Sequence, residues 1–267
     1  MKGLASIALL VALAAPAEAQ DIVGGQPTQN FRAVGIGVQV SADWVVTARH
    51  AAIGAGGTYE NGYGMRTVAE VYVPDSGDFP ANDFALLRLV PLATPVPGAF
   101  YPRLAAEPFT QGAFRPQPVT IVSTANHSPR GLGLTWITEA INTWDDDGPD
   151  GPLPFVDVNW LVSWDPNVRL ENGDSGGGLF LDHVRDNSGV LLGLNSALLP
   201  MEDGRVGSAF VQPAAYRAWI DGIMRADLHD DQLLQWASIS SPVPEPAAWA
   251  LLLAGALALL PRARRRG

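Results

Sequence analysis

The hydrophobic positions of this 267-residue chain fall in short runs, and turn residues separate one run from the next. The 28 glycines and 22 prolines supply these turns. The pattern predicts many short β-strands and few long helices. Residues 213–225 are the exception. There Tyr216, Ile220 and Ile223 recur at helical spacing, which predicts one helix near the end of the folded part.

The N-terminal segment has the pattern of an export signal. Residues 1–19 combine Lys2, an apolar run and a final AEA, which is typical of a secretory signal peptide cleaved after Ala19. Residues 20–21 then form a very short propeptide. Its removal requires a second cut, and the alternative is that the dipeptide stays in place.

The C-terminal segment carries a second apolar run. Residues 242–246 read PVPEP, residues 247–260 are apolar, and residues 262–266 hold four arginines. The apolar run is shorter than the roughly 20 residues of a full membrane span, and the arginines favour a cytoplasmic end. These parts resemble the PEP-CTERM sorting signal of Gram-negative bacteria. The resemblance implies transient inner-membrane anchoring, processing by an exosortase, and release or surface display; a simple tail anchor is the alternative.

Residues 172–178, with the sequence NGDSGGG, have the composition of an acyl-transfer site. Ser175 supplies a hydroxyl nucleophile. The glycines allow a tight turn in which backbone N–H groups can face a developing oxyanion. Asp174 predicts a buried charge that must find a cation. Such clusters are also ordinary turns, so the interpretation depends on the other segments.

A candidate base lies in residues 44–52, with the sequence WVVTARHAA. An apolar, β-branched run delivers His50 at the end of a predicted strand. Histidine has a pKa near neutrality and can therefore take a proton from a serine hydroxyl. The other histidines, His127, His183 and His229, lie in polar or charged segments.

A candidate partner for this base begins residues 83–89, with the sequence DFALLRL. Asp83 precedes an apolar strand, where an unpaired carboxylate is costly. A histidine Nδ1–H satisfies such a carboxylate and fixes the tautomer of the ring. Asp75 and Asp78 are the alternatives, but they lie in a Pro/Gly turn where solvated aspartates are expected.

A fourth segment, residues 22–25, reads IVGG directly after the predicted propeptide. It can be a plain opening strand. If the chain is cut before Ile22, however, the new ammonium is a cation small enough to enter the core and neutralise Asp174.

Together these segments resemble the trypsin/chymotrypsin family of serine endopeptidases, over roughly residues 22–225. The resemblance implies an all-β fold of two six-stranded antiparallel β-barrels, at about 22–118 and 119–212. The C-terminal helix (213–225) completes a domain at 22–226, and a polar linker (227–241) leads to the sorting tail (242–267).

The resemblance also implies chemical roles. His50 is expected to be the general base, Asp83 its orienting partner and Ser175 the nucleophile, with the amides of Gly173 and Ser175 as the oxyanion hole. Peptide bonds are hydrolysed through an acyl-enzyme without a metal or an organic cofactor. If Ile22 and Asp174 pair as in this family, the uncut protein is a zymogen.

Some positions depart from the family's pattern. The chain has no cysteine, so stability must come from the core. Arg49 precedes the histidine, where a small residue is usual. The pocket position six before the serine is Arg169, which favours acidic substrate residues or swings out to leave an apolar pocket. Ser196 is expected to bind the substrate backbone, and Leu198 to narrow the entrance.

Composition excludes one class of partner. The formal net charge is −10, and an acidic surface disfavours nucleic acid. Residues 145–151 hold enough carboxylates for Ca²⁺, although a solvated loop is the simpler interpretation because the EF-hand spacing is absent. The sequence therefore predicts a secreted or surface serine endopeptidase of a Gram-negative bacterium that acts on proteins or peptides. The alternative is a catalytically silent relative that serves as a binding module.

Overall fold

The structure is a computed structural model that describes residues 22–74, 79–112, 114–123, 130–144, 156–201, 203–226 and 234–239. The predicted signal peptide (1–19), the propeptide (20–21) and the sorting tail (242–267) with its apolar run (247–260) lie outside these ranges. Within them, no helix is long and apolar enough to cross a membrane.

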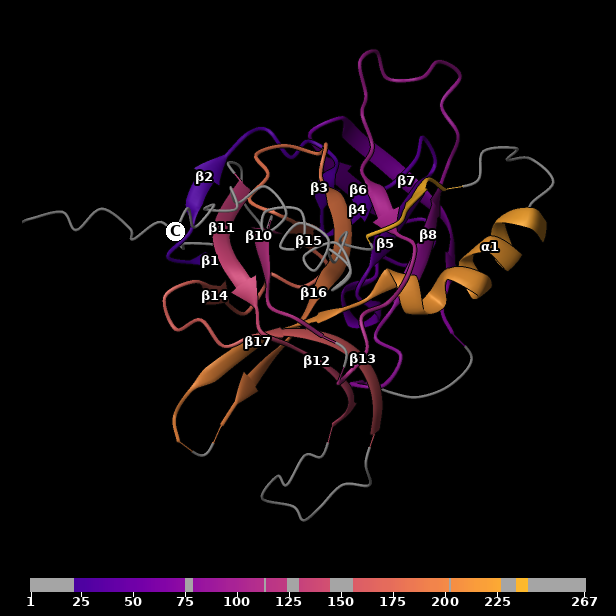
Figure 1. Ribbon diagram of the computed structural model, residues 1–267. Helices are drawn as coiled ribbons and strands as arrows, with labels where there is room; N and C mark the ends of the chain where they lie inside the picture. The colour runs from indigo at the N-terminus through magenta and orange to yellow at the C-terminus, as the bar shows by residue number, and fades with distance from the viewer. Residues whose placement is uncertain are drawn as a thin grey trace, which may run out of the picture.

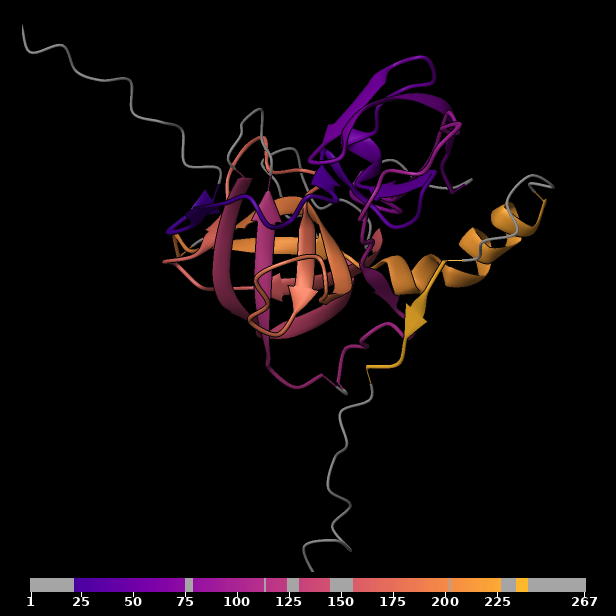
Figure 2. The same cartoon turned by 90° about the horizontal axis from the view of Figure 1, so that it is seen from above.

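Residues 34–89 form an antiparallel sheet that curls into the first barrel, drawn in indigo and purple in Figure 2. Its six described strands follow the order β3 (Val34–Gly35), β4 (Gly37–Gln39), β5 (Trp44–Thr47), β8 (Ala85–Leu89), β7 (Gly64–Tyr72) and β6 (Thr58–Asn61). The Tyr59 hydroxyl on β6 donates hydrogen bonds to the carbonyl oxygens of Ala33 and Gly37, both at 3.1 Å. These bonds link β6, at one edge of the sheet, to Ala33 just before β3 at the other edge and to Gly37 on β4.

The second barrel uses most of the remaining strands (Figures 1 and 2). Its strands follow the order β12 (Glu139–Trp144), β13 (Val156–Ser163), β17 (Val206–Val211), β16 (Val190–Pro200), β15 (Gly178–Leu181), β10 (Gln117–Ser123) and β11 (Arg130–Ile137). Only Thr138 separates β11 from β12, and its N–H donates to the Val162 carbonyl at 2.9 Å. Counted as one bent strand, β11 and β12 bring this barrel to six strands. The predicted all-β, chymotrypsin-like pair of barrels is confirmed.

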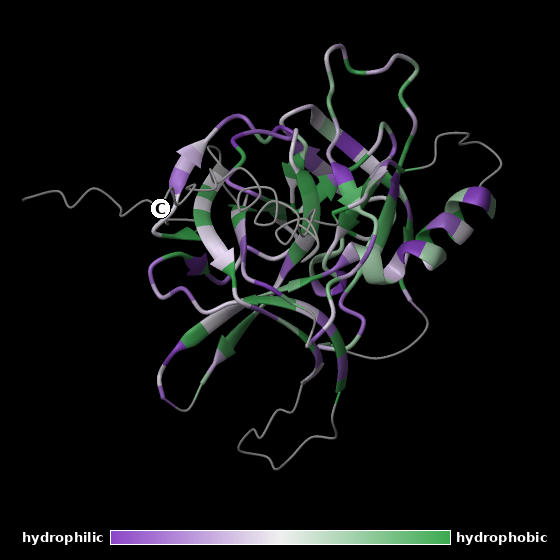
Figure 3. Ribbon diagram, viewed as in Figure 1, coloured by the Kyte–Doolittle hydropathy of each residue, from purple (hydrophilic) through white to green (hydrophobic). Residues whose placement is uncertain are grey.

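Strand alternation explains why many strands are apolar on both faces. On β5, Val45 packs inside the first barrel with Leu87. Its neighbours Trp44 and Val46 face the other way and pack with second-barrel residues such as Phe180. Successive side chains point to opposite faces of a strand, so a strand between two cores has no solvent face. Figure 3 shows these strands in green.

The N-terminal strands belong to the second barrel rather than the first. β1 (Ile22–Val23) pairs with β14 (Arg169–Leu170), and β2 (Gln26–Thr28) pairs with β11. The first barrel therefore spans fewer residues than the expected range 22–118. Sequence alone does not assign these strands, because their partners lie more than 100 residues away.

The predicted helix is present and begins with a tighter turn. A 3-10 turn, η2 (Pro213–Tyr216), leads into α1 (Arg217–Ala226). Pro213 occupies the first turn, where its missing N–H costs nothing. Tyr216 stacks on Phe84 of the first barrel with ring centroids 4.6 Å apart. The helix thus packs against both barrels (Figure 1).

The stretch expected to be a polar linker, residues 227–241, contains a strand. β18 (Trp236–Ala237) pairs in parallel with β9 (Arg103–Ala105), and β9 in turn pairs with β16. Leu234 is buried, and the Trp236 ring lies 5.0 Å from the Arg217 guanidinium on α1. The apolar residues of this stretch are interspersed with polar ones and follow no strict alternation, so they give too weak a pattern to predict this strand.

Leu234→Ala is expected to lower the free energy of unfolding by about 2–5 kcal/mol, because it removes a buried side chain and leaves a cavity. Gln235→Ala is the control, since the side chain of Gln235 is exposed and only its main-chain carbonyl binds Leu104. Urea denaturation measures both. Equal stability of the two variants would show that β18 is not part of the folded domain.

Candidate active site

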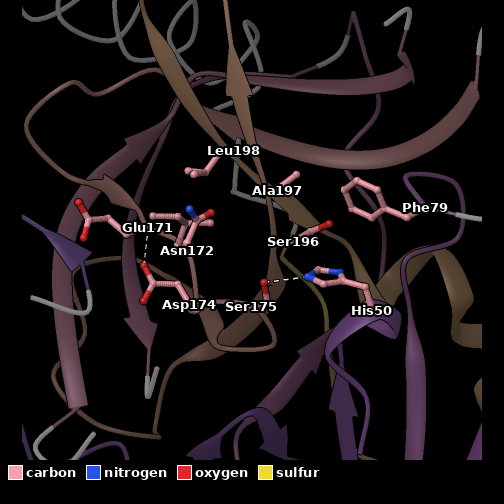
Figure 4. A pocket seen from close by; sticks show the side chains of 11 residues that line it. His50, Phe79, Glu171, Asn172, Asp174, Ser175, Ser196, Ala197 and Leu198 are labelled. Carbon is pink, nitrogen blue, oxygen red and sulfur yellow. Dashed lines mark hydrogen bonds between the residues drawn. The ribbon is translucent and has the colours of Figure 1, made fainter. Parts of the chain in front are cut away.

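His50 lies on a single 3-10 turn, η1 (Arg49–Ala51), directly after β5. The Ala51 amide closes this turn by donating to the Ala48 carbonyl at 3.1 Å. Because β5 is fully buried, the turn is held in place by the first barrel. Figure 4 shows the imidazole directed toward Ser175, with Phe79 beside it.

Asp83 lies just before β8 and is buried, at 1% exposure. Asn82 before it has a φ of +47°, which asparagine tolerates better than most residues. The carboxylate accepts hydrogen bonds from the His50 amide (3.0 Å) and from the Ser196 hydroxyl (2.6 Å). Imidazole Nδ1 lies 2.9 Å from Oδ2 and 3.0 Å from Oδ1. The charge expected beside an apolar strand is thus well satisfied.

Ser175 lies in the loop between β14 and β15, on the second barrel. Its Oγ is 2.7 Å from His50 Nε2. Since the Asp83 carboxylate only accepts, Nδ1 carries the proton of a neutral imidazole, and Nε2 is left to accept from the serine hydroxyl. The structure therefore brings together His50, Asp83 and Ser175 in the order that nucleophilic catalysis needs.

Two glycines shape the loop around Ser175. Gly173 has a φ of +102° in the turn closed by the bond from the Asp174 amide to the Glu171 carbonyl. Gly176 has a φ of +84°, and a Cβ there would lie 2.6 Å from Thr47 Oγ1 on the first barrel. Larger residues would strain the backbone at both positions.

The amides of Gly173 and Ser175 are available to a ligand. Among the described residues, no acceptor takes a hydrogen bond from either N–H group. The neighbouring Gly176 amide is fixed by the Asn195 carbonyl at 2.9 Å, and the Asn195 side chain donates to the Asp174 carbonyl at 3.0 Å. These bonds hold the loop that carries the two amides.

Asp174 is buried beneath this loop, at 1% exposure. Its carboxylate accepts from the Ser123 hydroxyl at 2.5 Å and from the Glu171 amide at 2.6 Å. Ile22, its expected partner, is also buried and pairs with Leu170 in the β1–β14 ladder. The two expected activation residues therefore lie on segments that meet within the second barrel.

A cavity of about 290 Å³ opens beside the nucleophile. Its lining comprises His50, Phe79, Leu170, Glu171, Asn172, Gly173, Asp174, Ser175, Ser196, Ala197 and Leu198. Leu198 borders it as expected. Ser196 also borders it, although its hydroxyl is used by Asp83.

Arg169, expected in the pocket, does not line this cavity. Arg169 lies on β14 and pairs with Val23 of β1. Its neighbour Leu170 borders the cavity instead. Adjacent residues of a strand point to opposite faces. An error of one position in assigning the residue that faces the cavity therefore puts an arginine where the structure has a leucine. The spacing from Ser175 alone does not determine which of these two residues faces the cavity. A fixed point such as a disulfide would be needed to determine it.

Several contributors to the site carry no local signal in the sequence. Ser123 and Asn195 hold Asp174, and Phe79 packs edge-on against the imidazole with centroids 5.3 Å apart. Ser123 is an ordinary serine at a strand end, and no local pattern marks it. Within the described ranges no group of His, Asp and Glu side chains gathers as metal ligands would, and the aspartates of 145–151 lie outside those ranges.

The hydrogen bond that the His50 side chain donates to Asp83 raises the pKa of His50 above its ordinary value of 6.5. Partial burial opposes this shift, and the charge of the carboxylate reinforces it. Because the folded-state pKa is the higher one, His50 protonation stabilises the fold below about pH 6.5. This contribution is lost as the pH rises through the folded-state pKa, where the ring becomes the neutral base.

Comparisons with known proteins add little to this geometry. No protein-family model matches the chain, and no curated protein matches it. One similar solved structure is a kallikrein-related peptidase 10 complex with Zn²⁺. It is 20% identical, covers 72% of this chain and 89% of its own, and has a TM-score of 0.46. We therefore base the following proposals on the contacts within this chain.

Asp83→Asn is expected to lower the pKa of His50, because the amide keeps the shape of the carboxylate but removes its charge. NMR titration of the imidazole in both proteins measures the shift. An unchanged His50 titration would mean that Asp83 does not govern this base.

Proposed function

We propose that this protein is a serine endopeptidase that hydrolyses peptide bonds through an acyl-enzyme. The observation that carries the proposal is the continuous chain of contacts from Asp83 to His50 (2.9 Å) and from His50 to Ser175 (2.7 Å). Base and nucleophile are within proton-transfer distance, and the carboxylate orients the base.

The first half of the reaction forms the acyl-enzyme. His50 Nε2 takes the proton of the Ser175 hydroxyl while Oγ attacks the carbonyl carbon of the substrate. The carbonyl oxygen becomes an oxyanion, which the amides of Gly173 and Ser175 stabilise. His50 then gives its proton to the leaving amine, the C–N bond breaks, and the acyl group stays on Oγ. Asp83 remains ionised and stabilises the imidazolium throughout.

The second half releases the product. Water enters beside the acyl group, gives a proton to His50 Nε2 and attacks the ester carbonyl. A second oxyanion forms at the same pair of amides, and its collapse returns the proton to Ser175 Oγ. The acid product leaves, and the site regains its starting protonation.

The alternative function, a catalytically silent binding module, has no specific support. A silent relative is expected to lack a member of the triad or to block the nucleophile. Here Ser175 is partly exposed and borders the cavity, and its Oγ lies 2.7 Å from His50 Nε2.

Activation by cleavage before Ile22 belongs to the same proposal. An ammonium at Ile22 would add a cation to a segment that already contacts the second barrel, where the buried Asp174 carboxylate has hydroxyl and amide donors. Ion pairing there would fix the loop that carries the Gly173 and Ser175 amides. We propose that the uncut chain is a zymogen with a less ordered oxyanion site.

We also propose export. The signal pattern of residues 1–19 and the PEP-CTERM-like tail (242–267) support secretion or surface display in a Gram-negative bacterium. Signal peptidase and an exosortase would be the processing partners, and the inner membrane would hold the chain transiently. A protein or peptide is the proposed substrate, and the acidic composition argues against nucleic acid.

Labelling with a fluorophosphonate tests the catalytic proposal. Protein cut before Ile22 is expected to be labelled on Ser175, because only an activated hydroxyl attacks the phosphorus. Ser175→Ala should lose the label, and Ser188→Ala, at an exposed loop serine, should keep it. Mass spectrometry locates the adduct, and an unlabelled wild-type protein would refute the function.

The same reagent tests activation. A removable segment placed before Ile22 gives uncut and cut protein from one preparation. The cut form should be labelled at least about 10-fold faster, a factor equivalent to about 1.4 kcal/mol of ordering at the site. Equal rates would show that the uncut chain already has a complete site.

A further inference from the structure

We propose that Ser123 is a positioning residue for the loop that carries the nucleophile, residues 171–177 (the Ser175 loop). Its hydroxyl holds the buried Asp174 carboxylate and thereby keeps the Ser175 amide in its direction, and it does so before the chain is cut. The inference rests on the proposed endopeptidase function and specifies what keeps that site partly ordered in the uncut chain.

The direction of the Ser175 amide follows from Asp174. A trans peptide unit is planar, so the Asp174 carbonyl and the Ser175 N–H lie in one plane and point opposite ways. The Asp174 carbonyl accepts hydrogen bonds from Asn195 Nδ2 at 3.0 Å and from the Gly177 amide at 3.2 Å. The Asp174 amide donates to the Glu171 carbonyl at 3.1 Å. Any movement of Asp174 therefore turns an amide that the proposed mechanism uses.

The side chain of Asp174 is the third point at which this residue is held. The Ser123 hydroxyl donates to Asp174 Oδ1 at 2.5 Å, and the exposed fractions of the two residues are 0% and 1%. Figure 4 shows the Asp174 side chain directed away from the Ser175 hydroxyl. The carboxylate is thus anchored on the side of the loop that is turned from the reacting atoms. Because a buried charge is costly without donors, this bond resists rotation of Asp174.

Ser123 makes this bond from a rigid support. It is the last residue of β10, which pairs with β11 on one side and with β15 on the other. The carbonyl of its neighbour Val122 accepts from Asn195 Nδ2 at 3.2 Å. A Cβ at Gly177 would lie 2.3 Å from this same carbonyl, so the Ser175 loop packs directly on the end of β10. The hydroxyl is therefore held by the barrel itself.

The two carboxylate oxygens of Asp174 receive hydrogen bonds from different segments. Ser123 on β10 binds Oδ1. Oδ2 accepts from the Glu171 amide, directly after β14, and β14 is the strand that pairs with Ile22. An ammonium formed at Ile22 would arrive along β14, on the side of Glu171. It would add a donor to Asp174 without displacing the Ser123 hydroxyl.

The bond from Ser123 does not depend on activation. The structure is that of the full chain, in which Asp21 precedes Ile22, and the Ser123 hydroxyl already contacts Asp174 there. A hydrogen bond to a charged group typically shifts an equilibrium by about 10- to 100-fold. We therefore expect the uncut chain to keep a measurable activity that Ser123 sustains. In the cut chain the ammonium supports the same carboxylate, so the share of Ser123 is smaller.

The test compares Ser123→Ala with the wild type, each before and after release of the removable segment in front of Ile22. Fluorophosphonate in excess gives the rate constant of labelling and, from the final extent, the fraction of intact sites. Uncut Ser123→Ala should be labelled at least about 10-fold more slowly than uncut wild type. The cut variant should be slowed by a smaller factor, so the ratio of cut to uncut rates rises.

Two further variants assign the effect to the hydroxyl. Ser163→Ala is the matched control, because Ser163 is a buried serine of the same barrel whose hydroxyl lies 3.3 Å from the Thr135 hydroxyl. It should be labelled at the wild-type rate. Ser123→Thr keeps a hydroxyl and should be labelled faster than Ser123→Ala. A threonine variant as slow as alanine would attribute the effect to packing and overturn the role of the hydroxyl.

The two readouts separate a positioning role from a purely structural one. Loss of labelled fraction with an unchanged rate constant would mean that Ser123 only supports folding, and would overturn the inference. Uncut wild type without any labelling, or uncut Ser123→Ala at the wild-type rate, would overturn it as well. Equal slowing of cut and uncut protein would refute the part that Ser123 plays before activation.

Failure of the inference and failure of the proposed function give different results. Cut wild-type protein without labelling would refute the function, and the inference with it. Cut wild-type protein that is labelled on Ser175, together with a Ser123→Ala variant that behaves like wild type in both forms, would refute the inference alone.

Discussion

The structure depends on how the buried carboxylate of Asp83 is satisfied. An ionised carboxylate away from water is costly unless hydrogen bonds replace its hydration. Here the donors come from both barrels: the amide and imidazole of His50 from the first, and the Ser196 hydroxyl from the second. Satisfying this one charge therefore fixes the tautomer of the base and ties the two halves of the site together.

The apolar contact between the barrels makes that arrangement rigid. Trp44 and Val46 on the first barrel pack in one cluster with Phe180 and Leu194 on the second. His50 follows β5 and Ser175 lies in the loop before β15, and both of these strands contribute residues to this cluster. A distance of 2.7 Å between Nε2 and Oγ across two barrels requires such a shared core, because flexible loops alone would not hold it.

The sequence predicted the triad because each member has a local signal. His50 follows one apolar run and Asp83 precedes another. Ser175 lies among glycines, which indicate a tight turn. The features it missed depend on partners distant in sequence. Leu170 rather than Arg169 borders the cavity because of the strand register. The hydrogen bond from Ser123 to Asp174 joins residues that are 51 positions apart. No local pattern records such pairings.

The central claim is that His50 and Ser175 act as one unit across the seam between the barrels. A double-mutant cycle measures this most directly, with kcat determined for His50→Ala, Ser175→Ala and the double variant. Groups that share one proton transfer lose their function together, so the double variant should be no slower than either single one. If the loss of kcat in the double variant equals the product of the two single losses, the two residues contribute independently. That result would contradict the account.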